Sequence, residues 1–161
     1  MANIQLLLRQ HVGAPCAPVV KVGDEVKKGT LVAEPTGLGA NIFSSVYGKV
    51  VEITEDRIII EPAAEQSDEY VKIEKSENKL DMIKAAGVVG LGGAGFPTAV
   101  KLGTDLNGGY ILINAAECEP GLRHNMVQLE DEEYCAKTVR GAVYCKEVAN
   151  AGKVIFALKK K

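Results

Sequence analysis

Tryptophan is absent from this chain of 161 residues, aromatic residues make up 5% of it, and the formal net charge is −2. Lysine and arginine form no block that alternates with aromatic side chains, so nucleic-acid binding has little support. Residues 1–13 lack a long apolar stretch and a small-residue cleavage site, so no secretory signal is predicted. The longest uncharged stretch, 85–100, is too short for a membrane span and is interrupted by glycines. These absences predict a cytoplasmic protein without a transmembrane segment.

Cysteine pairs with metal-ligand spacing are also lacking. No two of the four cysteines form a C-x-x-C pair, so neither a zinc site nor an iron–sulfur motif is predicted within the chain. In a cytosolic protein these cysteines are expected to be reduced thiols. His11 and His124 have no cysteine or carboxylate at ligand spacing and are predicted to be surface or capping residues. The cysteines are Cys16, Cys118, Cys135 and Cys145.

The composition changes near residues 61–70, which predicts two domains, 1–65 and 66–161. The first has short apolar runs separated by glycines, a pattern typical of a small all-β barrel or sandwich. The fold class we expect is α+β, with this barrel followed by the start of an α/β domain. The predicted strands are 19–22, 25–28, 31–33, 42–46, 49–53 and 57–60.

The pattern V-x-V-G-D-x-V-x-x-G-x-L-V at 20–32, followed by S-x-x-x-G-x-V at 44–50, resembles a biotinyl/lipoyl-type barrel-sandwich hybrid. Such carriers attach their cofactor to a lysine in the hairpin between the two halves. Residues 31–48 contain no lysine. A structural or docking barrel is therefore favoured over a biotinyl or lipoyl carrier.

The second segment alternates helical and strand patterns. A helix is expected from an N-cap region at 76–78 to a stop at Gly87, and a short helix after Pro97. Strands at 110–114 and 154–158 flank a long helix at 125–149, with Cys135 and Cys145 semi-buried in it. This order predicts a βαβ unit with parallel strands. Two parallel strands cannot bury both faces, so we expect the front part of a longer protein, or completion by other chains.

The run GLGGAGFPT at 90–98 is the strongest local motif. Such dense glycines leave backbone N–H groups free to bind phosphate. The run is not a Walker loop, and it is a poor Rossmann fingerprint because no clear strand leads directly into it. Lys101 follows closely and is a candidate phosphate partner. The alternatives are a glycine linker or tight packing corner, and a solvated lysine.

A second motif, NAAECEPG at 114–121, follows a predicted parallel strand at the end where ligands of open α/β sheets bind. Asn114 offers an amide, and Glu117 and Glu119 offer acceptors for ring N–H or ribose hydroxyl groups. The alternative is an acidic surface turn. Cys16 lies in the rigid run GAPCAP at 13–18 and is either an inert packed thiol or a redox thiol.

The two motifs together, with QHVGAP at 10–15 before the barrel, resemble the RnfC-like family. Its members include RnfC subunits, the NADH-binding flavoprotein subunit of respiratory complex I, and cobalamin reductases. Cys16 and the tract GANIFSSV at 39–46 look closest to the proline reductase-associated branch found in amino-acid-fermenting anaerobes.

This resemblance implies FMN held by the glycine loop and the Asn-x-x-Glu segment, with NADH stacked on the flavin. The protein would hold and orient the rings, and the redox chemistry would belong to the cofactor. Phe96 is a candidate to stack on a ring, and Glu119 matches a position near the nicotinamide nucleotide. The implied cofactor-binding residues are Gly90, Gly92, Gly93, Gly95, Phe96, Lys101, Asn114, Ala116, Glu117, Cys118 and Glu119.

The resemblance further implies hydride transfer from NADH to FMN, then single-electron transfer to iron–sulfur clusters or to a reductase partner. Family members carry their [4Fe–4S] clusters in a later domain, so we expect this chain to be the N-terminal part of such a subunit. The rival is a non-catalytic docking module for a reductase complex. The electron acceptor, the choice between NADH and NADPH, and the oligomeric state stay open at this point.

Overall fold

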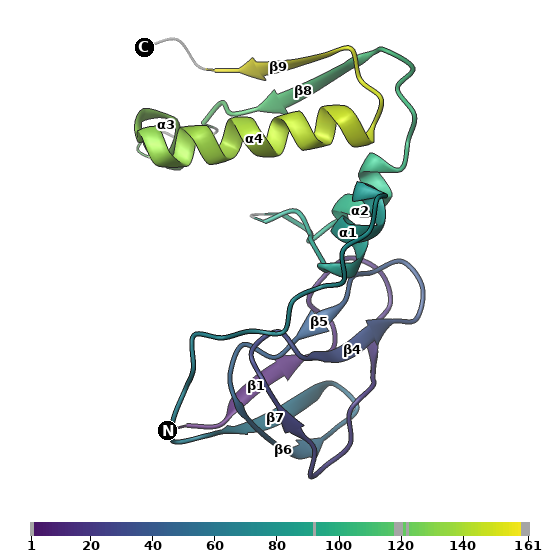
Figure 1. Ribbon diagram of the computed structural model, residues 1–161, viewed down its shortest axis with the longest axis vertical. Coiled ribbons are helices and arrows are strands. Elements are labelled where there is room, and N and C mark those ends of the chain that lie inside the picture. Colours follow the sequence, from purple (N-terminus) through teal and green to yellow (C-terminus); the bar gives the residue numbers. More distant parts are fainter. Residues whose placement is uncertain (1, 92, 118–120, 122, 159–161) are drawn as a thin grey trace. The chain divides into compact units, whose positions relative to one another are not determined.

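The computed structural model describes residues 2–91, 93–117, 121 and 123–158 (Figure 1). The chain forms two compact units, Met1–Lys101 and Leu102–Lys161. The first unit therefore contains the glycine loop as well as the barrel, and the second contains the NAAECEPG motif. The domain boundary between residues 65 and 66, which the composition predicts, stays a prediction, because the two compact units are defined by contacts rather than by sequence domains.

The first unit contains two antiparallel sheets. One has the strand order β1-β7-β6-β3 and the other the order β2-β4-β5. The strands are β1 (Ile4–Leu7), β2 (Cys16–Pro18), β3 (Glu25–Val26), β4 (Leu31–Pro35), β5 (Ile42–Phe43), β6 (Gly48–Ile53) and β7 (Arg57–Pro62). Short strands in two sheets that share one core are the arrangement expected of a barrel-sandwich.

Branched aliphatic side chains fill this core. In β7, Ile58 and Ile60 are fully buried and alternate with more exposed residues, because successive side chains of a strand point to opposite faces. Val32 of β4 and Val50 of β6 are equally buried. Burying one such side chain contributes about 1.5–3 kcal/mol, so these four positions contribute substantially to the stability of the unit.

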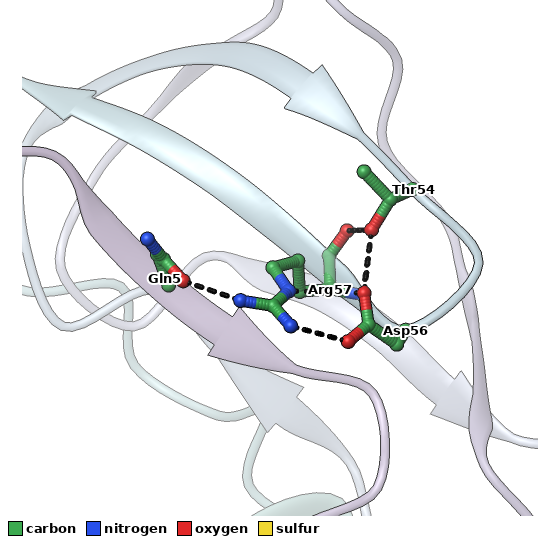
Figure 2. Close-up of polar contacts among 4 residues, drawn as sticks. All are labelled: Gln5, Thr54, Asp56 and Arg57. Atoms are coloured by element: carbon green, nitrogen blue, oxygen red, sulfur yellow. Dashed lines mark hydrogen bonds and ion pairs between the residues drawn. The ribbon is translucent and has the colours of Figure 1, made fainter.

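A polar cluster closes the β6–β7 turn and ties it to β1 (Figure 2). The guanidinium of Arg57 donates to both carboxylate oxygens of Asp56 and, at 2.7 Å, to the side-chain oxygen of Gln5. The Thr54 hydroxyl donates to Asp56 Oδ1 at 2.8 Å. These hydrogen bonds, Arg57 first, lower the pKa of the Asp56 carboxyl well below its usual value.

The stretch after β7 is held against the barrel. Ala63 donates its N–H to Tyr47 O at 2.8 Å, and the Tyr47 hydroxyl donates to Glu69 O at 3.0 Å. Val71 donates its N–H to Lys28 O at 2.8 Å. The segment 63–71 is thus hydrogen-bonded to the surface of the barrel.

Several strand predictions are confirmed and others need correction. Strands are found at the predicted ranges 25–28, 31–33, 49–53 and 57–60, with ends that differ by one or two residues, but the range 42–46 is a strand only at 42–43. The strand predicted at 19–22 is wrong: Asp24 accepts from the Lys21 N–H at 2.8 Å and donates its own N–H to Lys21 O, which forms a turn. Strands β1 and β2 were missed. The sequence of β2, Cys16–Pro18, predicts a loop because it ends in one proline and directly follows another, and only pairing with β4 makes it extended.

Two short helices follow the barrel. Helix α1 (Lys79–Ala85) begins as predicted, with the Asn78 side chain accepting from the Leu80 N–H at 3.0 Å. Gly87 ends it with a φ of +64°, which confirms the predicted stop. The Asn41 side chain donates to Ala85 O at 3.3 Å and so fixes the end of α1 on the barrel. Helix α2 (Thr98–Leu102) follows Pro97 as expected.

The second unit is a βαβ arrangement, as predicted. Strands β8 (Tyr110–Asn114) and β9 (Lys153–Ala157) pair in parallel, and the helices between them run alongside the pair (Figure 1). The expected single helix is two helices, α3 (His124–Glu130) and α4 (Glu132–Val148). Asp131 separates them because its backbone is extended and its side chain caps α4, accepting from the Tyr134 N–H at 2.9 Å.

Two further observations concern the helices. Cys135 and Cys145 are half-buried in α4, as predicted, and burial raises the pKa of the Cys145 thiol. Within the part of the chain that the structure describes, no helix combines the length and apolarity needed to cross a membrane.

Candidate functional site

The glycine loop is closed at its base like a small hairpin. Gly90 donates its N–H to Phe96 O at 3.0 Å, and Thr98 donates its N–H to Val88 O at 2.9 Å. An isolated antiparallel bridge joins Val89 to Pro97. The chain therefore enters and leaves the loop side by side, and the glycines are presented on a fixed base rather than in an open linker.

The amides within the loop are available as donors. The N–H groups of Leu91, Gly93, Ala94, Gly95 and Phe96 have no hydrogen-bond acceptor among the atoms that the structure describes. A Cβ added at Gly93 would meet no atom within 4 Å, so this position faces open space. Free backbone donors beside open space are the chemistry that a phosphate group requires, and the loop fits the FMN phosphate in this respect.

Two other predicted residues lie together beside the loop. Lys101 Nζ lies 5.8 Å from the centre of the Phe96 ring, within cation–π range. Phe96 is 36% exposed. The structure thus brings a cation and a partly exposed aromatic ring to the end of the loop, where both are accessible to a ligand.

A groove of about 840 Å³ opens in the first unit, along the β4–β5 hairpin and the two short helices. Its walls are mainly apolar, and Val88, Pro97 and Val100 line it close to the ends of the glycine loop. Lys84 and Asp81 of α1 add charged groups to it. Such a concave surface can receive a ligand or a segment of another chain.

In the second unit, the Asn-x-x-Glu segment starts at the carboxyl end of β8 as predicted. Asn114 Oδ1 accepts from the Ala116 N–H at 3.1 Å, which forms an Asx turn. The Asn114 Nδ2 group has no acceptor among the described atoms and stays available to a ligand. Ala116 is partly buried in this turn. The amide at the strand end is therefore oriented by its own backbone.

Glu117 has a different immediate environment from the one predicted. Its side chain is 6% exposed, and Oε1 accepts from the Asn125 N–H at 2.6 Å and the Met126 N–H at 3.3 Å. Oε2 lies 3.3 Å from His124 Nδ1. The carboxylate thus caps the first turn of α3, where free N–H groups favour a negative charge. His124 is exposed, as predicted for a surface residue.

The prediction for His11 is wrong. His11 is 7% exposed rather than a surface residue, and its Nε2 lies 3.3 Å from Cys16 Sγ. Nε2 also accepts from the Ala40 N–H at 3.2 Å. Ligand spacing alone could not reveal this contact. A signal in the sequence was Gly13 between the two residues, because its φ of +107° is a backbone conformation that favours glycine and marks a sharp bend.

Cys16 is buried, at 3% exposure, and burial raises the pKa of its thiol. Its S–H donates to Ala40 O at 3.3 Å. A reactive cysteine needs an accessible thiolate, and this environment favours the protonated form. The surroundings of Cys16 are therefore those of a packed thiol.

Three predicted residues, Gly92, Cys118 and Glu119, lie outside the described residues. Among those that are described, no group of three or more His, Cys, Asp or Glu side chains is arranged to hold a metal ion.

Comparison with protein families matches both parts of the chain. Residues 1–78 match the RnfC barrel sandwich hybrid domain, and residues 83–161 match the Nuo51 FMN-binding domain. The fold is thus that of a barrel-sandwich domain followed by a flavin-binding domain. The chain belongs to the RnfC-like family.

Curated relatives agree with this assignment. Over 94% of its length the chain is 38% identical to a subunit of a proton-translocating ferredoxin:NAD(+) oxidoreductase complex from Clostridium ljungdahlii, and it covers 37% of that protein. It is 38% identical over 76% of its length to a subunit of the Na(+)-translocating complex of Acetobacterium woodii, of which it covers 32%. It is 32% identical over 86% of its length to a subunit of an ion-translocating oxidoreductase complex from Vibrio cholerae, of which it covers 20%. The chain thus spans little more than a third of these relatives at most.

Proposed function

We propose that this chain binds FMN, with the amides of the glycine loop holding its phosphate, as part of an electron-transfer protein that takes electrons from NADH. The single observation that carries the proposal is the set of free amides at 91 and 93–96, in the segment that matches an FMN-binding domain. Such donors provide a strong site for a phosphate dianion.

The described residues have separate roles in this proposal. The loop amides bind the phosphate, and Lys101 adds a positive charge beside Phe96. In the second unit, the free Nδ2 of Asn114 stays a candidate donor to a ligand, and Glu117 fixes the strand end by capping α3. When bound, FMN supplies two-electron acceptance from a nicotinamide dinucleotide and single-electron release.

The onward electron acceptor is proposed on the family likeness. The relatives are named as subunits of ferredoxin:NAD(+) oxidoreductase complexes. We propose that this protein likewise works in a multi-subunit complex and passes electrons to iron–sulfur clusters in a later domain, or to a reductase partner.

Titration of FMN into the purified chain tests the flavin site. We expect saturable quenching of flavin fluorescence by the wild type and its loss in Gly93→Val, because the added side chain would occupy the open space beside the loop amides. Gly37→Val is the matched control, since a Cβ at Gly37 also meets no atom within 4 Å but lies on the β4–β5 hairpin. Equal quenching by Gly93→Val would contradict the site.

The rival function, a docking module, is supported by the groove of about 840 Å³ in the first unit. It predicts no flavin quenching by the wild type. It also predicts loss of complex assembly when a charged residue replaces Val100 on the groove wall. If the wild type binds FMN and Val100→Glu still assembles, the docking function fails.

We propose proline reductase as the specific electron acceptor, because Cys16 and residues 39–46 resemble the proline reductase-associated branch of the family. The test is to isolate the native complex and measure proline-dependent oxidation of NADH. A complex that reduces ferredoxin and leaves proline unchanged would overturn this assignment.

A redox role for Cys16 is a separate hypothesis, and its burial and raised pKa weigh against it. We expect iodoacetamide to alkylate Cys16 much more slowly in the native protein than in the urea-unfolded chain, measured by mass spectrometry of the peptide. Fast native alkylation, together with impaired electron delivery in Cys16→Ser, would instead support the redox role.

A further inference from the structure

The second half of the glycine loop rests on the barrel segment around His11, within the first unit. Val12 donates its N–H to Ala94 O at 2.9 Å. Gly95, with φ +67°, packs so closely that an added Cβ would lie 3.0 Å from His11 Cα and 3.1 Å from Gln10 O. The loop therefore touches the barrel through backbone atoms at its most constrained glycine.

The His11 side chain is itself held by the β4–β5 hairpin. Nε2 accepts from the Ala40 N–H at 3.2 Å, which leaves the proton on Nδ1, from which it is donated to Val12 O at 3.0 Å. A Cβ at Gly39 would lie 2.5 Å from His11 Cε1, so only glycine allows the β4–β5 hairpin to close over the ring. His11 thus contacts the hairpin with its ring and the glycine loop with its backbone.

We propose that His11 is a positioning residue for the flavin site: the β4–β5 hairpin fixes its ring, and its main chain in turn fixes the glycine loop. The barrel is then part of the flavin site rather than a separate module. In lipoyl and biotinyl carriers this hairpin bears the cofactor lysine; here it holds a histidine beneath a phosphate-binding loop. The inference rests on the proposed function, because it concerns the loop that receives FMN.

The physical reason is preorganisation. The free amides of the loop bind a phosphate best when their directions are fixed before binding, because ordering them during binding weakens affinity. Apart from the closure of its own base, the described loop residues have the Val12–Ala94 hydrogen bond and the Gly95 contact as their anchors. A substitution that removes the contacts of the His11 ring leaves the sequence of the loop unchanged, but it should make the loop amides less ordered.

The experiment compares two matched pairs in the full chain by FMN titration, at a temperature where circular dichroism shows each variant folded. The first pair is Gly39→Ala, whose methyl group would displace the His11 ring, against Gly37→Ala on the same hairpin, which meets no atom within 4 Å. The second is His11→Phe, which keeps a ring but no acceptor, against His11→Gln, which can still accept from the Ala40 N–H.

We expect Gly39→Ala and His11→Phe to weaken FMN binding about tenfold, the effect of losing one supporting hydrogen bond, while Gly37→Ala and His11→Gln stay close to wild type. Hydrogen exchange of the Val12 amide should accelerate in the first two variants. If these variants melt earlier but bind FMN as the wild type does, His11 only stabilises the barrel and the inference is overturned. If the wild type itself does not bind FMN, the proposed function fails and this inference falls with it.

Discussion

The two units of the molecule bury their apolar residues very differently. In the first, the fully buried side chains include large, branched ones such as Ile58 and Ile60. Of the residues described in the second, those that are buried are Leu102 and four alanines, while Tyr110 and Leu112 of β8 are more than 60% exposed, at 69% and 66%. Parallel strands normally have both faces covered. The barrel thus has a complete core of its own, and the βαβ unit has little.

The same contrast applies to the two motifs that identified the family. The glycine loop is anchored on a rigid barrel through Val12 and Gly95. The β8 strand end is fixed by local capping, with Glu117 on α3 and Asn114 on its own turn. One motif therefore depends on the tertiary structure of the barrel, and the other on short-range hydrogen bonds.

Truncating one isoleucine in each unit should expose this difference most strongly. Ile58→Ala in β7 is expected to lower the free energy of unfolding of the barrel by about 2–5 kcal/mol, because it leaves a cavity in a fully buried site. Ile155→Ala in β9, where the residue is 40% exposed, should cost about 1 kcal/mol or less. Urea denaturation followed by circular dichroism measures both.

The control is Ile58→Val, which should cost about 0.5–1.5 kcal/mol because it removes one methylene group. If Ile155→Ala destabilised the chain as much as Ile58→Ala, the second unit would have a core comparable to that of the first. The comparison between the units would then be wrong.

A smaller effect is expected at the junction of the two helices in the second unit. Asp131→Ala removes the side chain that caps α4 and should lower stability by about 1 kcal/mol. Asp131→Asn should retain most of it, since an amide oxygen also accepts from the Tyr134 N–H. Thermal melting followed by circular dichroism distinguishes them. Equal loss in both variants would mean that the charge, rather than the cap, stabilises the helix.

How far the sequence predicted the fold depended on the range of the interactions. Strands β6 and β7 were predicted because Lys49–Ile53 and Arg57–Ile60 are rich in β-branched residues between turn signals, and the parallel β8–β9 pair followed from the order of the elements. Strand β2 was missed, because only its partner β4 makes Cys16–Pro18 extended. The helix break was missed because Asp131 within a helical pattern gives no local stop until its capping role is seen.

The candidate site shows the same limit. Lys101 was predicted as a phosphate partner from its position after the loop, and Phe96 as a ring contact from the family resemblance. The approach of Lys101 Nζ to within 5.8 Å of the Phe96 ring centre was not predicted. The buried contact of His11 with Cys16 was not found, because it depends on how the barrel loops fold over each other. Glu117 was predicted from its position as a ligand contact, yet its nearest partners are the amides of α3, eight and nine residues further along the chain.

The smallest effect should come from the surface cluster at the β6–β7 turn, which tests whether the barrel depends on its core or on exposed charges. The pKa of Asp56 is lowered by Arg57 and Thr54, so its ionised form stabilises the folded state. This contribution is complete above the ordinary carboxyl pKa of about 4 and is lost as the pH falls toward the lowered value. Asp56→Asn should therefore lower the urea midpoint slightly at neutral pH, with the difference shrinking in acid.

Asp68→Asn, whose carboxylate lies 3.8 Å from Lys28 Nζ on the surface, is the control and should change little. A large loss at Asp56 would mean that exposed charges, and not only Ile58 and its neighbours, set the stability of the first unit.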